Sequence, residues 1–208
     1  MNHLAVAQND GVVTIRQVSG SENTEKNALI DLDDVVCTLS KSKDWIESMH
    51  YSPDGKMLAV GSHDHRIDVY ICEQTGKYVI KCELNAHNSF ITSMDWTLDS
   101  KWIRSVCGGY ELLFHNIKDG KHDEKGAEKT KGMEWSSHKV KFGWRVEGIF
   151  PPGTDGTHVN NCCLSSDKEI IAVGCDFGNV RLYRNPCREG SKARVLRGHS
   201  DQVTNLDF

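Results

Sequence analysis

Residues 58–69 read Leu-Ala-Val-Gly-Ser-His-Asp-His-Arg-Ile-Asp-Val, which is an apolar run, a polar turn and a second run of alternating side chains. The same order recurs in residues 4–15, 103–114 and 171–182. Alternation with a period of two predicts β-strands, and Gly, Asp or Asn at the reversal predicts a tight turn. The sequence therefore predicts four antiparallel hairpins.

A further strand is expected ahead of three of these hairpins, at residues 45–51, 91–96 and 159–164. Each is followed by a polar turn, and Ser52-Pro-Asp-Gly-Lys56 is the clearest of them, because proline presets φ and Asp or Ser caps the turn. A fourth such strand is expected at residues 203–208. No apolar stripe with the helical period of 3.6 is sustained, so we expect helix to be absent or limited to short turns.

The spacing of the hairpins predicts the architecture. Those starting at residues 58 and 103 are 45 residues apart, which matches the ~40–45-residue period of a WD40 blade. We therefore predict an all-β fold, a partial WD40-type β-propeller with about four to five blades in an open arc. Its two exposed sheet edges would favour aggregation unless another chain or segment covers them.

The repeat also predicts the organisation of the chain. We expect a partial blade with a connecting strand in residues 1–40 and two WD40 blades in 41–117. An insertion and linker follow in residues 118–157, because the next hairpin begins later than the period requires. Residues 158–208 are expected to form one WD40 blade and the first strand of the next.

Two histidines stand just before an expected first strand, His87 after Ala86 and His199 after Gly198. In WD40 blades such a His reaches inward and forms a hydrogen bond with an Asp in the turn of the hairpin. Asp10 and Asp64 hold that turn position here. We therefore expect His87 and His199 to be structural residues.

The polar pattern is incomplete in every blade. Gly109 and Phe177 stand where two of the turn Asp residues belong, and residues 41–44 contain no His ahead of the blade that has Asp64. We therefore expect divergent blades that are stabilised more by apolar packing than by a polar network.

The expected insertion has two unlike halves. Residues 118–131 contain five Lys and four acidic side chains, which predicts a solvated, mobile loop. Residues 133–150 include Trp135, Phe142 and Trp144 and are too apolar for a free loop. We expect this second half to form an outer strand and a linker packed on the blade.

The bulk composition excludes several partners. With 25 basic and 29 acidic side chains the net charge is −4, which argues against a nucleic-acid partner held by a general basic field. No apolar stretch approaches the ~18 residues that a membrane-spanning segment needs. The first ten residues lack the basic start and apolar core of a signal peptide, so we expect the eight cysteines to be reduced, mostly buried thiols in a cytosolic protein.

No catalytic motif is found in the sequence. There is no nucleophile elbow, dinucleotide-binding glycine motif, phosphate-binding loop or His-Glu-x-x-His pattern. His63-Asp64-His65 lies on a tight turn, where neighbouring side chains diverge, and His158 with Cys162 and Cys163 has no second ligand pair. We therefore predict no catalytic, cofactor-binding or metal-binding residues and no small-molecule substrate.

Longer stretches resemble the echinoderm microtubule-associated protein-like (EMAP-like) family, within the second WD40 propeller of its tandem atypical propeller domain. The resemblance runs from about Trp45 to Phe208, and more weakly from Leu4. The matching stretches are Tyr51-Ser-Pro-Asp-Gly-Lys-Met-Leu-Ala-Val-Gly-Ser-His-Asp64, Val146-Glu-Gly-Ile-Phe-Pro151, Asp176-Phe-Gly-Asn-Val-Arg-Leu-Tyr183 and Gly198-His-Ser-Asp-Gln-Val-Thr-Asn-Leu-Asp-Phe208. Generic WD40 blades do not have the Gly-Ile-Phe-Pro linker.

The resemblance implies a non-catalytic scaffold that binds tubulin, microtubules and associated proteins. It implies a cytoplasmic, cytoskeletal location, with cilia and the spindle as specific sites. A generic WD40 adaptor in a signalling or ubiquitin-ligase complex would have the same fold and differ in its partner. The Gly-Ile-Phe-Pro linker favours the EMAP-like assignment over this alternative.

Overall fold

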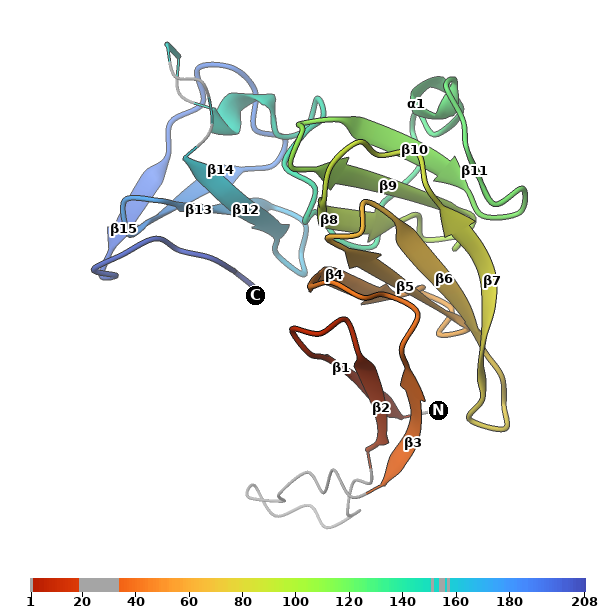
Figure 1. Cartoon of the computed structure of the whole chain (residues 1–208). Coiled ribbons are helices and arrows are strands. Elements are labelled where there is room, and N and C mark those ends of the chain that lie inside the picture. Colours follow the sequence, from red (N-terminus) through yellow and green to blue (C-terminus); the bar gives the residue numbers. More distant parts are fainter. Residues whose placement is uncertain (1, 19–33, 151, 154–155, 157) are drawn as a thin grey trace.

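The four predicted hairpins are present, each in its own antiparallel sheet. The computed structural model describes residues 2–18, 34–150, 152–153, 156 and 158–208. The sheets lie one after another around a common centre and form an open arc (Figure 1). We call them blades 1 to 4 in chain order, and the predicted partial β-propeller is confirmed.

Blade 1 has three strands in the described residues, and blades 2 to 4 have four each. In blade 1 these are β1 (His3–Ala7), β2 (Val13–Gln17) and β3 (Val35–Leu39). Blade 2 consists of β4 (Ile46–Tyr51), β5 (Met57–Ser62), β6 (Ile67–Cys72) and β7 (Tyr78–Leu84). Blade 3 consists of β8 (Ile91–Trp96), β9 (Trp102–Cys107), β10 (Leu112–Asn116) and β11 (Lys121–His122). Blade 4 consists of β12 (Val159–Leu164), β13 (Ile170–Cys175), β14 (Asn179–Arg184) and β15 (Arg194–Arg197).

The turn after the first strand of a complete blade has the same hydrogen bonds each time. In blade 2 the Ser52 hydroxyl donates to Asp54 Oδ1 (2.6 Å), which also accepts from the Lys56 backbone N–H (3.1 Å). Thr97 and Asp99 repeat this arrangement in blade 3, as Ser165 and Asp167 do in blade 4. A short side chain that replaces a missing backbone partner stabilises a tight turn, as the sequence pattern predicts.

Apolar side chains fill the spaces between neighbouring blades. Between blades 1 and 2, Val13 and Ile15 pack with Leu58, Val60 and Tyr70. Between blades 2 and 3 the core contains Ala59, Ile67, Val69, Leu84, Ile91, Met94, Trp96 and Ile103. Both faces of the middle strands are therefore buried, and their sequences read as nearly continuous apolar runs.

Residues 118–131 are mostly exposed, as expected, but they contain regular structure where a loop was expected. Lys121–His122 pairs with β10 as the outer strand β11, and Gly126–Lys129 forms the short helix α1. A side chain at Gly126 would overlap Phe114, so only glycine permits this close packing of α1 on β10. The Thr130 hydroxyl donates to the Gly126 carbonyl (2.8 Å), which ties the end of α1 to its beginning.

Residues 133–150 pack as a linker, but the expected outer strand does not form there. Trp135 makes a single bridge to Thr97, and the following residues are irregular up to the 3₁₀ turn η1 (Glu147–Ile149). The outer position of blade 3 is already occupied by β11, so the linker runs between blades 3 and 4 instead. Its buried side chains Val146 and Ile149 join the core of blade 4.

Residues 203–208 do not form the expected strand. The Val203 N–H donates to the Cys175 carbonyl (3.0 Å), and the Val203 side chain is buried, but no regular ladder follows. An antiparallel strand requires a ladder of hydrogen bonds along its length, and among the described residues no strand forms one with this segment.

Two further expectations are met in the described part of the chain. Helix is limited to α1 and η1, and neither is long or apolar enough to cross a bilayer. All eight cysteines are free thiols, of which five are buried and Cys37, Cys72 and Cys82 are half-buried.

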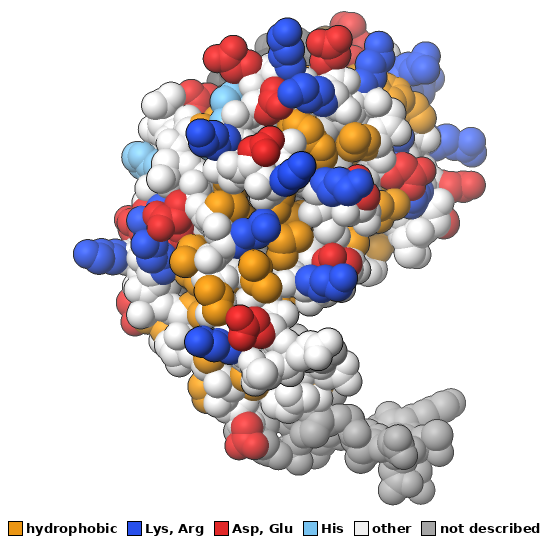
Figure 2. Space-filling view, turned by 90° about the vertical axis from the view of Figure 1, so that its right-hand side faces the viewer, with side chains coloured by type: hydrophobic (Ala, Val, Ile, Leu, Met, Phe, Trp, Pro, Cys, Tyr) orange, Lys and Arg blue, Asp and Glu red, His pale blue; other side chains and the backbone are white. Residues whose placement is uncertain are grey.

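Figure 2 shows the outer side of the arc, where apolar side chains lie among Lys and Arg side chains.

Candidate functional site

The His63-Asp64-His65 stretch does not converge on a metal ion. Asp64 Oδ2 accepts hydrogen bonds from the Ser42 hydroxyl (2.8 Å) and the Lys43 N–H (2.9 Å). His63 Nε2 lies 2.9 Å from Glu47, so its ring points elsewhere. Asp64 is thus the turn acceptor that the sequence predicts, and Ser42 supplies the donor where a His is missing.

His158, Cys162 and Cys163 also fail to meet at one point. The His158 ring lies against Phe177, with 5.9 Å between ring centroids. The Cys162 thiol donates instead to the His138 carbonyl (3.1 Å), and burial raises its pKa. A thiol held in its protonated form is a poor metal ligand and a poor nucleophile.

His87 reaches inward as predicted and begins a buried chain of hydrogen bonds. Its Nε2 lies 2.7 Å from the Ser105 hydroxyl, which lies 2.9 Å from His115 Nε2. The carboxylate missing at Gly109 comes from Glu111, whose Oε2 is 3.6 Å from His87 Nδ1. At 3.6 Å this contact is beyond hydrogen-bond distance, so the predicted hydrogen bond from His87 to a turn carboxylate does not form, and the ring is hydrogen-bonded to Ser105 instead.

Hydrogen bonds hold the Glu111 carboxylate in place. Asn88 donates to it from both its side chain (2.8 Å) and its backbone (3.1 Å), and together with the Cys107 thiol these bonds lower the pKa of Glu111 to about 2. The ligand atoms of His87, Cys107 and Glu111 lie within 4.8 Å of one another, a spacing that could hold a metal ion. Within blade 3, the same side-chain atoms lie at the turn between β9 and β10.

His199 does not reach inward as expected. Its side chain is exposed, and its carbonyl instead lies against Gly178, where a side chain would overlap it. A ring before the first strand of a blade reaches the hairpin of that same blade, as His87 does.

The buried histidines predict a pH dependence of stability. Burial, together with the neighbouring His87 and His122, lowers the pKa of His115 to about 3, against about 6.5 in an unfolded chain. Because the folded pKa is the lower one, this contribution is fully present above about pH 6.5 and is lost as the pH falls toward 3. We expect the free energy of unfolding, from urea titrations, to decrease over this range.

His115→Gln should make this decrease with pH smaller, whereas the control His199→Gln, at an exposed site, should leave it unchanged. If the free energy of unfolding depends on pH equally in the unaltered protein and both variants, His115 is not the group responsible.

A buried ion pair joins β8 and β9 of blade 3 to the linker. Asp95 and Arg104 face each other across the ladder, and Arg104 Nε and Nη2 donate to Asp95 Oδ2 at 2.9 and 2.8 Å. Asp95 also accepts from the Ser137 hydroxyl (2.6 Å) and the Lys139 N–H (2.8 Å). Asp95 therefore holds the linker against blade 3.

The electrostatics of this pair favour the charged state. Burial opposes ionisation of Asp95, but Arg104, His138 and the hydrogen bonds from the linker outweigh it and hold its pKa below the usual range. Burial and the Arg104 charge lower the pKa of His138 to about 4, so its ring is neutral near pH 7. The Asp95–Arg104 pair is thus fully ionised beside a neutral imidazole.

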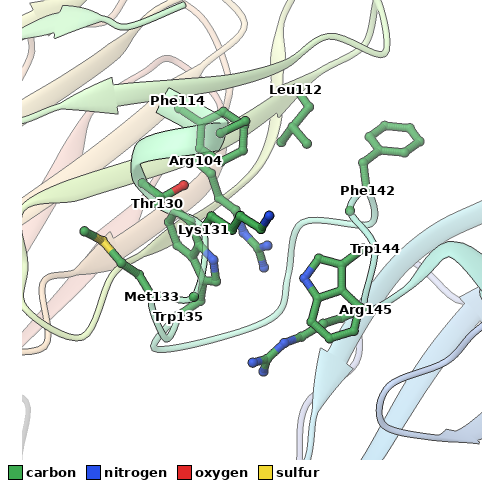
Figure 3. Close-up of a pocket in the computed structure, with 13 residues that line it drawn as sticks. Arg104, Leu112, Phe114, Thr130, Lys131, Met133, Trp135, Phe142, Trp144 and Arg145 are labelled. Atoms are coloured by element: carbon green, nitrogen blue, oxygen red, sulfur yellow. The ribbon is translucent and has the colours of Figure 1, made fainter. Parts of the chain in front are cut away.

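Next to this ion pair the linker and α1 enclose a pocket of about 280 Å³ (Figure 3). Arg104, Lys131 and Trp135 lie on one side of it, and Phe142, Trp144 and Arg145 lie on the other. The Arg104 guanidinium lies 4.5 Å from the Trp135 ring centroid and that of Arg145 lies 5.5 Å from the Trp144 ring. The lining contains three cationic side chains and no acidic one.

This pocket was not predicted from the sequence, although the sequence patterns around its residues indicated a buried ion pair and a packed aromatic segment. A charged residue within an apolar strand, as in Ile91-Thr-Ser-Met-Asp-Trp96 and Trp102-Ile-Arg-Ser-Val-Cys107, indicates a buried ion pair. The aromatic residues of 133–150 were recognised as too apolar for a free loop. That both sets line one cavity follows only from the path of the linker.

The comparisons with known proteins agree with this architecture. All of residues 1–208 match the family described as the echinoderm microtubule-associated protein second β-propeller. The ciliary WD repeat-containing protein ctxp80 of Euplotoides octocarinatus is 46% identical over 206 residues, which are 99% of this chain and 27% of that protein. Echinoderm microtubule-associated protein-like 1 of Rattus norvegicus is 36% identical over 177 residues, 84% of this chain and 22% of that protein.

Two further similarities extend the comparison. The 77 kDa echinoderm microtubule-associated protein of Lytechinus variegatus is 36% identical over 181 residues, 86% of this chain and 27% of that protein. This chain thus spans about a quarter of the length of these relatives. A chain in the crystal structure of the mitotic checkpoint complex superimposes with a TM-score of 0.52 over 98% of this chain and 52% of its own, at 14% identity, which supports the fold alone.

Proposed function

We propose, because the chain belongs to the echinoderm microtubule-associated protein family as part of its second β-propeller, that it is a non-catalytic scaffold that binds tubulin in microtubules. The relatives from Lytechinus variegatus and Rattus norvegicus carry microtubule association in their names, and the relative from Euplotoides octocarinatus is named as a ciliary protein. These names support a cytoskeletal location for this chain, with microtubules as the specific partner.

The geometry supports a binding role more than a catalytic one. The reactive side chains that the sequence offers, including His87, Cys162 and Asp95, take part in hydrogen bonds within or between blades. A general base or nucleophile needs an approachable partner in a cleft, and these groups are buried. Rigid blades leave their connecting loops at two rims of the arc, where a partner protein can bind (Figure 1).

Microtubule co-sedimentation tests this function. The protein is incubated with stabilised microtubules and centrifuged, and we expect it to move from the supernatant to the pellet in a saturable way. The matched control is the same protein centrifuged without microtubules, because open sheet edges can make a protein sediment by itself. If the protein stays in the supernatant at every tubulin concentration, the generic WD40 adaptor alternative replaces this function.

A further inference from the structure

The pocket between α1 and the linker contains an unused hydrogen-bond donor at its base. Arg104 is 6% exposed, and its Nε and Nη2 are occupied by Asp95 and His138. Its remaining amino group, Nη1, makes no hydrogen bond within the described residues. It lies on the pocket side, since the Cβ position of the lining residue Gly143 is 3.9 Å from it. A nearly buried guanidinium with a free donor favours an oxygen acceptor on a ligand.

The rim adds two cationic side chains to the pocket. Lys131 and Arg145 both line the pocket, and neither makes an ion pair within the described residues. The charge of Arg104 is balanced by Asp95, so these two rim cations give the opening its net charge. They attract an anion and repel a cation, although the chain as a whole carries −4.

The walls supply apolar area next to these donors. Trp144 is 61% exposed, and in Figure 3 its ring lies across the pocket from Trp135 and Phe114. Gly132 and Gly143 have φ values of 85° and 127°, which other residues rarely adopt, so the backbone of both rims is shaped by glycine. The volume of about 280 Å³ is slightly below the ~300–1,000 Å³ typical of small-molecule sites, which suits inserted side chains better than a whole cofactor.

We propose that this pocket binds an acidic peptide segment of a partner protein. A Glu or Asp carboxylate of the segment accepts from Arg104 Nη1, and an adjacent aromatic or aliphatic side chain packs against Trp144 and Trp135. Further carboxylates lie near Lys131 and Arg145 at the rim. The inference goes beyond microtubule binding, because the peptide is recognised by charge and shape whichever protein carries it.

The test uses a short fluorescent peptide in which Glu residues flank a single Phe. Anisotropy titrations of the protein, taken from the monomeric peak of a size-exclusion column, should show saturable binding that weakens as salt is added. Arg145→Glu and Trp144→Ala should each weaken the affinity by about tenfold or more. Both side chains lie at the surface of the pocket, and circular dichroism verifies that each variant is folded.

Control variants and control peptides test whether the binding depends on this pocket and on the acidic and aromatic side chains of the peptide. Arg197→Glu, an exposed charge reversal on β15, and Phe177→Ala, an exposed aromatic truncation, should leave the affinity unchanged. A peptide with Gln in place of Glu, or Ala in place of Phe, should bind more weakly. The proposal is overturned if folded Arg145→Glu binds the peptide as well as the unaltered protein, or if ATP binds here more tightly than the peptide. Co-sedimentation with microtubules is scored separately, so the failure of one proposal is distinguishable from the failure of the other.

Discussion

Replacing Asp95 with alanine should lower the free energy of unfolding by about 3–5 kcal/mol, because removing one member of a buried pair leaves the other charge uncompensated. Asp95 is fully buried, and it is the acceptor for Arg104 and for two donors of the linker. Its loss would leave Arg104 charged in a site that is 6% exposed. It would also release the linker from blade 3.

Urea denaturation at pH 7 measures this effect. The matched control is Glu134→Ala, which breaks the exposed ion pair with Lys168 (2.7 Å) and should change stability far less, because solvent screens the two charges. Adding Arg104→Ala to Asp95→Ala should cost less than the sum of the single changes, because the two residues form one unit. A cost for Asp95→Ala as small as that for Glu134→Ala would show that the pair does not hold the linker.

Replacing Gly148 with alanine is the second change with a large expected effect. Gly148 lies in η1, and its N–H donates to the Cys187 carbonyl (2.9 Å). A Cβ at this position would overlap the Arg188 carbonyl group and would lie 3.0 Å from Cys187 Sγ. The obstacle is backbone, which cannot turn aside as a flexible side chain can. We expect a loss of about 3 kcal/mol or more, at the upper end for overpacking.

The control for Gly148 is Gly198→Ala. No atom lies within 4 Å of the Cβ position at Gly198, and its φ is not in the left-handed region, so this change should leave stability nearly unaltered. Thermal unfolding followed by circular dichroism compares the two variants. Equal stability of both would mean that the linker and the 187–188 segment separate without cost. The expected loss gives a physical reason for glycine within the Gly-Ile-Phe-Pro linker.

The polar groups of this chain illustrate how divergent blades keep their turns. Ser42 replaces a His as the donor to Asp64 in blade 2, and Glu111 replaces an Asp as the carboxylate near His87 in blade 3. In blade 2 the hydrogen bond is retained at a different chain position, whereas in blade 3 Glu111 lies 3.6 Å from His87 Nδ1, beyond hydrogen-bond distance. Apolar packing between the blades is therefore accompanied by a polar contact from a substitute residue in blade 2.

Local patterns determined most of the fold. The hairpins in blades 1 to 4 and the turns at Ser52, Thr97 and Ser165 follow from alternation and turn chemistry, both of which act over a few neighbouring residues. The regular spacing of these units then predicted a propeller. These features can be predicted from the sequence because each depends on contacts between residues that are close together along the chain.

Tertiary structure alone decided where the linker runs and what it forms. The two-residue strand β11 has no period to detect, and the close packing of the adjoining α1 on Phe114 requires glycine at position 126. With the outer edge of blade 3 taken, residues 133–150 pass between blades 3 and 4, where Asp95 holds them and Trp144 faces Trp135 across a cavity. From the sequence, the buried charge and the aromatic residues of the linker are seen as two unrelated features. Their association depends on contacts between residues about 40 positions apart, which local patterns do not predict.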